Sequence, residues 1–117
     1  MSYVQGFVAA VPEANKQAYI DSAEEAWPLF EEYGALAHWE CWEEDVPEGE
    51  VTSFPMAVKR EPDEKIVFAW VVWRDKAAVD ACHASMSTDK RWERLSMPFD
   101  GKRMIFGGFS PVFVAEA

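Results

Sequence analysis

The sequence predicts an α+β fold, in which an antiparallel sheet carries two main helices on one of its faces. Three observations support this class: short runs rich in β-branched and aromatic residues, two segments with apolar residues at helical spacing, and helices that alternate with strands. A chain of 117 residues suits one hydrophobic core, so we expect a single domain over residues 1–117. Half of the residues are hydrophobic and 15% are aromatic, which excludes a disordered chain.

The first part of the chain predicts a strand followed by a helix. Tyr3–Val11 is rich in β-branched and aromatic side chains and stops at a proline, which indicates a strand. In Glu13–Tyr33 the apolar residues recur every three or four positions, as in a helix that packs on a sheet. Pro28 is expected to kink or split this helix, and Gly34 is suited to end it.

Three extended segments and a loop follow the helix. Ala35–Glu43 predicts a strand, and Asp45–Ser53 predicts a polar loop whose proline and glycine mark turns. Phe54–Arg60 and Lys65–Trp73 are two apolar runs separated by polar, turn-forming residues, so we expect them to form a β-hairpin.

The last part of the chain predicts a second helix and a final strand. Asp75 is suited to cap a helix that runs to about Met86, and Asp89 to cap a short helical piece. Arg103–Val114 predicts the last strand, in which two adjacent glycines indicate a close approach of neighbouring groups or a bulge. The order of elements is ferredoxin-like, with one additional strand.

The second face of this sheet predicts the assembly. Two helices cover only one face, and a sheet rich in Trp and Phe would expose an apolar surface on the other. Two such sheets that pair face to face bury both surfaces. We therefore expect a homodimer in which the two sheets form a dimeric α/β barrel.

The net charge and the cysteine content limit which classes of binding partner and which cellular compartment are expected. The net charge is −10, and an acidic surface repels nucleic acid and anionic membranes, so neither is an expected partner. The apolar run Ile66–Trp73 is too short to span a bilayer, and the N-terminal residues lack the features of a signal peptide. Cys41 and Cys82 form no metal or redox motif, so we expect free thiols in the cytoplasm.

Several segments, above all the run from Met97 to Phe109, closely resemble the YbaA-like proteins, a bacterial family of unknown function within the dimeric α/β-barrel superfamily. The resemblance implies a ferredoxin-like subunit and a barrel built from two sheets, but it implies no activity. The wider superfamily includes cofactor-free oxygenases, lactone isomerases, haem-handling proteins and stress-induced barrels. The matching segments are Phe30, Tyr33–Leu36, Glu40–Trp42, Asp45–Pro47, Gly49, Val51–Thr52, Phe54, Met56–Lys59, Val67–Phe68, Trp70 and Met97–Phe109.

Strand alternation selects the candidate site residues. In Ala35–Glu43 the odd positions include small alanines, which suit close packing against helices, so the even positions are assigned to the barrel interior. The same rule assigns the odd positions of the first strand and the aromatic positions Phe68 and Trp70 to that interior. The resulting cavity is mostly aromatic with a few polar groups, which is typical of a small-molecule pocket. Its predicted lining is Gln5, His38, Glu40, Trp42, Phe68, Trp70 and Arg103.

Two interpretations of this cavity remain open. Glu40 and His38, two residues apart on one strand face, are candidates for proton transfer, and Arg103 for stabilising an oxyanion. Alternatively, Glu40 forms a structural ion pair and the aromatic side chains form an interface. Cys41 lies on the opposite strand face from His38, and two histidines without ligand spacing predict no metal or cofactor site.

The sequence therefore predicts a cytoplasmic homodimer that binds a small molecule on the sheet face. The alternative is a cofactor-free enzyme of the monooxygenase or isomerase type that uses Glu40 and His38.

Overall fold

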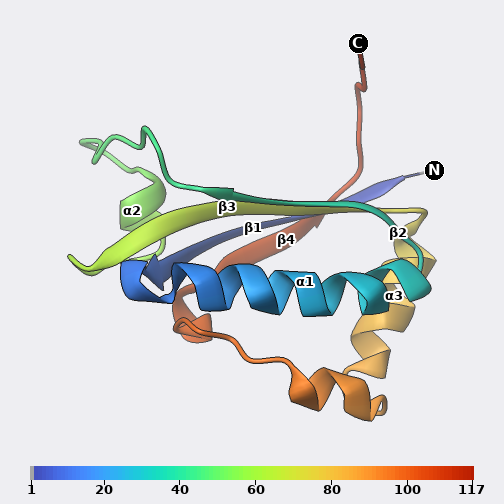
Figure 1. The fold of residues 1–117 in the computed structure, drawn as a ribbon. Helices are drawn as coiled ribbons and strands as arrows, with labels where there is room; N and C mark the ends of the chain where they lie inside the picture. Colours follow the sequence, from blue (N-terminus) through green and yellow to red (C-terminus); the bar gives the residue numbers. More distant parts are fainter. Residues whose placement is uncertain (1) are drawn as a thin grey trace.

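The protein forms one four-stranded antiparallel sheet with its long helices on one side (Figure 1). This computed structural model describes residues 2–117. The strand order is β2-β3-β1-β4, which confirms the ferredoxin-like α+β fold. The elements are β1 (Tyr3–Pro12), α1 (Lys16–Glu32), β2 (Ala35–Trp42), α2 (Phe54–Ala57), β3 (Glu64–Trp73), α3 (Lys76–Ser85) and β4 (Ile105–Phe109), with 3-10 turns at Glu13–Asn15, Lys90–Arg94 and Gly101–Arg103.

The predicted hairpin is wrong, because Phe54–Arg60 does not form a strand. The helical turn α2 occupies its first half. Ser53 caps this turn, since its Oγ accepts a hydrogen bond from the Met56 amide at 3.0 Å, and Pro55 lies in the first turn, where a missing N–H costs nothing. The sheet therefore has four strands rather than five.

The final strand is also shorter than predicted. β4 spans five residues, and Arg103 belongs to a 3-10 turn that Asp100 caps through the Lys102 amide at 3.0 Å. The chain after Phe109 leaves the sheet and rises from the side opposite the long helices (Figure 1). Gly108 of β4 has a steric role, because the Tyr3 ring lies where a side chain at this position would stand.

The helix boundaries follow the capping signals in the sequence. Gly34 has a φ of 111° just after α1, and Asp75 accepts from the Ala78 amide at 2.8 Å, so both predicted caps are confirmed. Asp89 likewise caps the turn Lys90–Arg94. Pro28 lies inside α1 and does not split it.

The core lies between the sheet and the helices. Trp73 and Val71 of β3 pack with Val79 and Cys82 of α3, and aromatic side chains of α1 close over them. The buried strand residues therefore fix which way β1 and β3 present their alternate side chains.

The opposite face of the sheet carries uncovered aromatic side chains. Trp39 stacks on Trp70 with ring centroids 5.6 Å apart, and Phe68 contacts Trp70 at 5.6 Å. Trp39 is 59% exposed and Phe109 is 61% exposed. We call this surface the open face.

Candidate functional site

Three polar side chains form a hydrogen-bonded chain between α1 and β2. The Tyr19 hydroxyl donates to Oε1 of Glu40 at 2.5 Å, and Nε2 of His38 lies 2.6 Å from Oε2 of the same carboxylate. The side chains of His38 and Glu40 are 9% and 25% exposed. We call this group the polar triad, and it forms the candidate site.

Strand and helix geometry together position the polar triad. His38 and Glu40 are two residues apart on β2, so their side chains leave the same face of the sheet. α1 lies across that face and brings Tyr19 to the far carboxylate oxygen. The His38 ring packs near Trp27 and Phe30 of α1, with ring centroids 6.3 and 5.4 Å away. These aromatic neighbours restrict the orientation of the imidazole.

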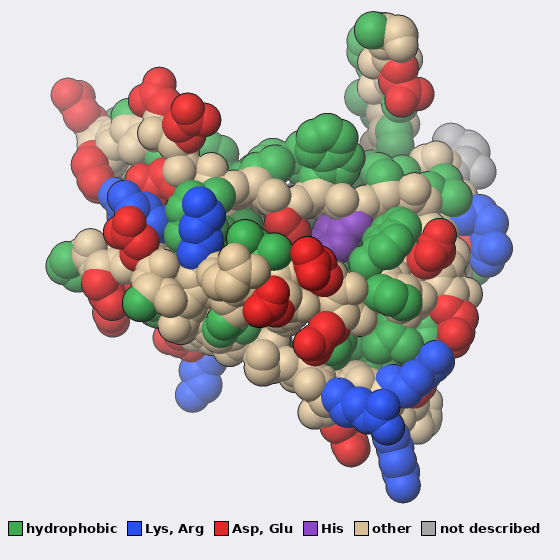
Figure 2. Space-filling model, viewed as in Figure 1, with side chains coloured by type: hydrophobic (Ala, Val, Ile, Leu, Met, Phe, Trp, Pro, Cys, Tyr) green, Lys and Arg blue, Asp and Glu red, His purple; other side chains and the backbone are tan. Residues whose placement is uncertain are grey.

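Two hollows meet at the polar triad. An inner cavity of about 150 Å³ lies beneath α1, and an outer groove of about 590 Å³ lies along the outer side of β2. Figure 2 shows this side of the molecule, with acidic side chains over α1 below a band of hydrophobic side chains. Both hollows share Ala23, His38 and Glu40; the cavity adds Phe7, Phe30, Val71, Phe99 and Met104 among others, and the groove adds Ile20, Glu24, Trp27, Ala37 and Trp39.

The hydrogen-bond pattern determines what the polar triad offers a ligand. Burial, together with the charge of Glu40, raises the pKa of Tyr19 above its ordinary value, so its hydroxyl remains a donor. An ionised Glu40 only accepts, so Nε2 of His38 carries the proton in their hydrogen bond. Among residues 2–117 no group bonds to Nδ1 of His38, which in the neutral ring is a free acceptor.

The predicted face of the sheet is wrong for His38, Glu40 and Trp42. All three lie on the helix side of the sheet, not in a barrel interior: the Trp42 ring lies 5.4 Å from Nζ of Lys16. The physical reason is a bulge between Ala35 and Ala37, which reverses the alternation along β2. The sequence contains no distinct signal for this bulge.

Gln5 is also on the helix side and belongs to a separate polar group. Its Oε1 accepts from Nε1 of the buried Trp73 at 2.8 Å, and its Nε2 lies 2.8 Å from Nε2 of His83 on α3. The even and odd positions of β1 are both largely apolar, so their alternation does not indicate which set faces the helices. Gln5 therefore lies away from the polar triad.

Arg103 does not reach the polar triad and forms an ion pair elsewhere. It donates to both carboxylate oxygens of Glu64 at 2.7 and 2.6 Å, and to Asp100 at 3.0 Å. Hydrogen bonds from Arg103 lower the pKa of Glu64, although burial acts in the opposite direction. The same hydrogen bonds, which Glu64 accepts, raise the pKa of Arg103. These contacts hold the turn before β4 against the start of β3.

Phe68 and Trp70 lie on the open face, as predicted, and so the sheet separates them from the polar triad. The predicted lining is thus divided between the two faces. Sequence reasoning missed Tyr19 as the partner of Glu40. The available signal was its place in the apolar stripe of α1, one turn before Ala23.

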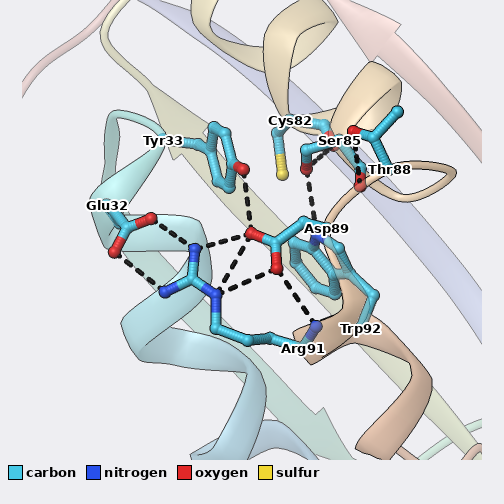
Figure 3. A network of polar contacts seen from close by, with 8 residues as sticks. All are labelled: Glu32, Tyr33, Cys82, Ser85, Thr88, Asp89, Arg91 and Trp92. Atoms are coloured by element: carbon cyan, nitrogen blue, oxygen red, sulfur yellow. Dashed lines mark hydrogen bonds and ion pairs between the residues drawn. The ribbon is translucent and has the colours of Figure 1, made fainter.

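A second polar network fixes the C-terminal end of α1 (Figure 3). Arg91 donates to Glu32 of α1 at 3.0 Å and to Asp89 at 3.0 Å, and the Tyr33 hydroxyl donates to Asp89 at 3.0 Å. Hydrogen bonds from Arg91 lower the pKa of Asp89. Trp92 completes the network by donating to Ser85 at 2.9 Å. These contacts tie α1 to α3 and so help to set the position of α1 over β2.

Two other classes of site receive no support from the described chain. Within residues 2–117, no group of three or more His, Cys, Asp or Glu side chains is arranged to hold a metal ion. No helix in that part of the chain combines the length and the apolar composition needed to cross a membrane.

Solved structures of low sequence identity share this fold. SnoaB, a cofactor-independent oxygenase from Streptomyces nogalater, matches with a TM-score of 0.59 and 14% identity over 97% of this chain and 95% of its own. A dimeric ferredoxin-like protein from an uncultured marine organism matches with a TM-score of 0.56 and 12% identity, over 99% of this chain and 98% of its own.

Sequence comparison identifies the family. The model of a family described as a protein of unknown function, DUF1428, matches residues 2–101. The uncharacterized protein YbaA of Escherichia coli K12 is 52% identical over 114 residues, which cover 96% of this chain and 97% of that protein. The chain therefore belongs to the DUF1428 family and is a YbaA-like protein, as the run from Met97 to Phe109 predicts.

Proposed function

We propose that the protein binds a small molecule with an aromatic ring and a hydroxyl group in the cavity beneath α1. The observation that carries this proposal is the polar triad, which ends at the wall of a cavity whose other lining side chains are apolar except for Ser22. A cavity of about 150 Å³ matches the size that admits a single benzene ring. The adjoining groove supplies room for a larger substituent.

The polar end of the cavity favours a hydroxyl over a purely apolar ligand. Nδ1 of His38 is a free acceptor in the neutral ring, and each oxygen of Glu40 retains a lone pair after its hydrogen bond. A ligand hydroxyl bound there gains a hydrogen bond that a plain hydrocarbon does not form. Hydrogen bonds to charged groups contribute about 1.5 to 3 kcal/mol, or roughly tenfold to a hundredfold in affinity.

Phenol and benzene are matched probes for this proposal. We expect phenol to bind at least tenfold more tightly than benzene, and Glu40→Gln to reduce that preference. Ligand-observed NMR titration of the full chain measures both dissociation constants. Glu44→Gln, at an exposed carboxylate beyond the end of β2, is the matched control and should leave the preference unchanged. Equal affinities of the wild-type protein for phenol and benzene would exclude the polar triad as a binding group.

We further propose that the open face is covered by a second copy of the chain. It exposes Trp39, Phe68 and Phe109 together, a patch that single soluble domains rarely leave in water. A relative in fold is itself described as dimeric. Light scattering should give twice the mass of one chain, and Trp70→Glu should give a monomer. A wild-type monomer at micromolar concentration would contradict this assembly.

A second candidate function is cofactor-free proton transfer, and the His38–Glu40 pair favours it. A carboxylate that holds one imidazole nitrogen leaves the other free to remove a proton, which is the arrangement of a general base. Cofactor-free oxygenation and isomerisation both begin with such a removal, and SnoaB is described as a cofactor-independent oxygenase.

Deuterium exchange at the acidic carbon of 2-indanone tests this second function. The wild-type protein should accelerate exchange in D₂O, as followed by proton NMR, and His38→Gln should return the rate to that of buffer. Glu44→Gln again serves as the control. Exchange in the presence of the wild-type protein that is no faster than in buffer would rule out His38 as a base for this class of substrate.

A further inference from the structure

We propose that the segment Ser110–Ala117 of one copy lies along strand β2 of a second copy and closes the outer groove beside His38 there. The binding site would then contain residues of both chains. This inference rests on the proposed homodimer and goes beyond it, because it assigns a role to a segment outside the sheet. We call this segment the C-terminal arm.

The C-terminal arm presents apolar side chains without cover in a single chain. It follows β4 and rises away from the sheet on the side of the open face (Figure 1). Val112 is 99% exposed and Phe113 is 83% exposed. A second copy that covers the open face would stand beside the arm, so the same assembly offers cover to both surfaces.

The edges of the sheet determine which strand the arm meets. β2 and β4 are the two edge strands. When two sheets stack face to face, a two-fold axis parallel to the strands places β4 of one copy opposite β2 of the other. An axis across the strands instead places β4 opposite β4. In the first arrangement β4 of each copy lies beside β2 of the other, so unlike edges join and eight strands close into a barrel without free edges; this arrangement is part of the proposal.

Strand register then gives the level at which the arm meets β2. Phe109 pairs with Val4, Val4 pairs with Val72, and Val72 pairs with Ala37, so these residues share one level across the sheet. A two-fold axis parallel to the strands preserves this level. The arm of one copy therefore leaves β4 opposite Ala37 of the second copy, next to its His38.

The reach of the arm fits the outer groove. Stacked sheets lie about 10 Å apart, and an extended chain advances about 3.3 Å per residue. Three residues beyond Phe109, at Val112, the arm arrives at the plane of the second sheet. Phe113 and Val114 then lie on its helix side, where Ile20 and Trp27 of α1 line the groove of about 590 Å³.

Crosslinking between two differently substituted chains tests this contact. In a Cys41→Ser background, Val114→Cys is placed on one full-length chain and Glu24→Cys, at the rim of the groove, on another. After subunit exchange and treatment with a short bismaleimide, mass spectrometry should find a covalent heterodimer. Asp80→Cys on the exposed surface of α3 replaces Glu24→Cys in the matched control, and there we expect at least a tenfold lower yield.

The outcomes separate this inference from the proposals on which it rests. Equal yields with Glu24→Cys and Asp80→Cys, in a protein that is dimeric by light scattering, would overturn the arm contact and leave the homodimer intact. A monomeric protein would overturn both. Because the crosslink needs no ligand, its result is independent of phenol binding.

Discussion

Replacement of Gln5 by leucine tests whether this residue is structural, as its contacts indicate, or binds a ligand, as the sequence predicts. Gln5 is buried, and its Oε1 accepts from Nε1 of Trp73, whose side chain is fully buried. An indole N–H donates and never accepts, so it fixes the amide with its oxygen toward Trp73 and its NH₂ toward His83. Leucine keeps the approximate volume of glutamine and removes both hydrogen bonds.

The expected cost follows from the group that is left without a partner. In Gln5→Leu the Trp73 N–H stays buried and loses its acceptor, which costs about 1–3 kcal/mol of unfolding free energy. Unfolding entropy scales as about 2.1 cal/mol/K per residue, so for a chain of 117 residues the midpoint should fall by roughly 4–12 °C.

Urea denaturation at fixed protein concentration measures this cost, and a double-mutant cycle assigns it. In a Trp73→Phe background there is no indole N–H to lose its acceptor. The loss of unfolding free energy caused by Gln5→Leu should therefore be at least about 1 kcal/mol smaller there than in the wild-type background. Additivity within about 0.5 kcal/mol would refute the hydrogen-bond explanation. Phenol affinity should stay unchanged in Gln5→Leu, and a loss of affinity there would restore Gln5 as a ligand-binding residue.

Three further predictions concern ionisable side chains. Arg103 lowers the pKa of Glu64 below 4.5, so the stabilisation from ionised Glu64 is complete above that pH and is lost as the pH falls through the folded pKa. Urea denaturation at a series of acidic pH values should therefore show that the unfolding free energy of Glu64→Gln falls less steeply with decreasing pH than that of the wild-type protein. An equally steep fall in both proteins would contradict this. Burial raises the pKa of Cys82 to about 11, so iodoacetamide at pH 7 should label Cys41 well before Cys82, as mass spectrometry can follow; equal labelling would refute the burial. Neutral His83 should carry its proton on Nδ1, because Nε2 must accept from Gln5; ¹⁵N NMR that finds the proton on Nε2 would reverse the assigned hydrogen bond.

Local signals in the sequence were sufficient for most of the fold. The capping residues Gly34 and Asp75 mark helix ends where the structure has them, because caps depend on a few neighbouring residues. The same chemistry was available for α2, since Ser53 and Pro55 are typical of a helix start. The prediction of a strand over Phe54–Arg60 was wrong because a short apolar run is compatible with both a strand and a helix.

The candidate site depended on information that local patterns do not contain. The spacing of His38 and Glu40 correctly places them on one strand face, but the bulge before Ala37 decides that this face meets α1. Tyr19 becomes the partner of Glu40 only when helix and strand pack together. Arg103 pairs with Glu64 for a similar reason, since the turn that carries it docks on the start of β3.

The place of β1 in the sheet has a consequence for synthesis on the ribosome. β1 emerges first, yet it is an interior strand whose neighbours are β3 and β4. Tyr3 pairs with Trp73, and Val4 pairs with Phe109, so the first strand finds its second neighbour only when almost the whole chain has been made. Until then one edge of this largely apolar strand has no native partner, and such segments promote aggregation of nascent chains. We expect the sheet to be completed only after β4 has been made.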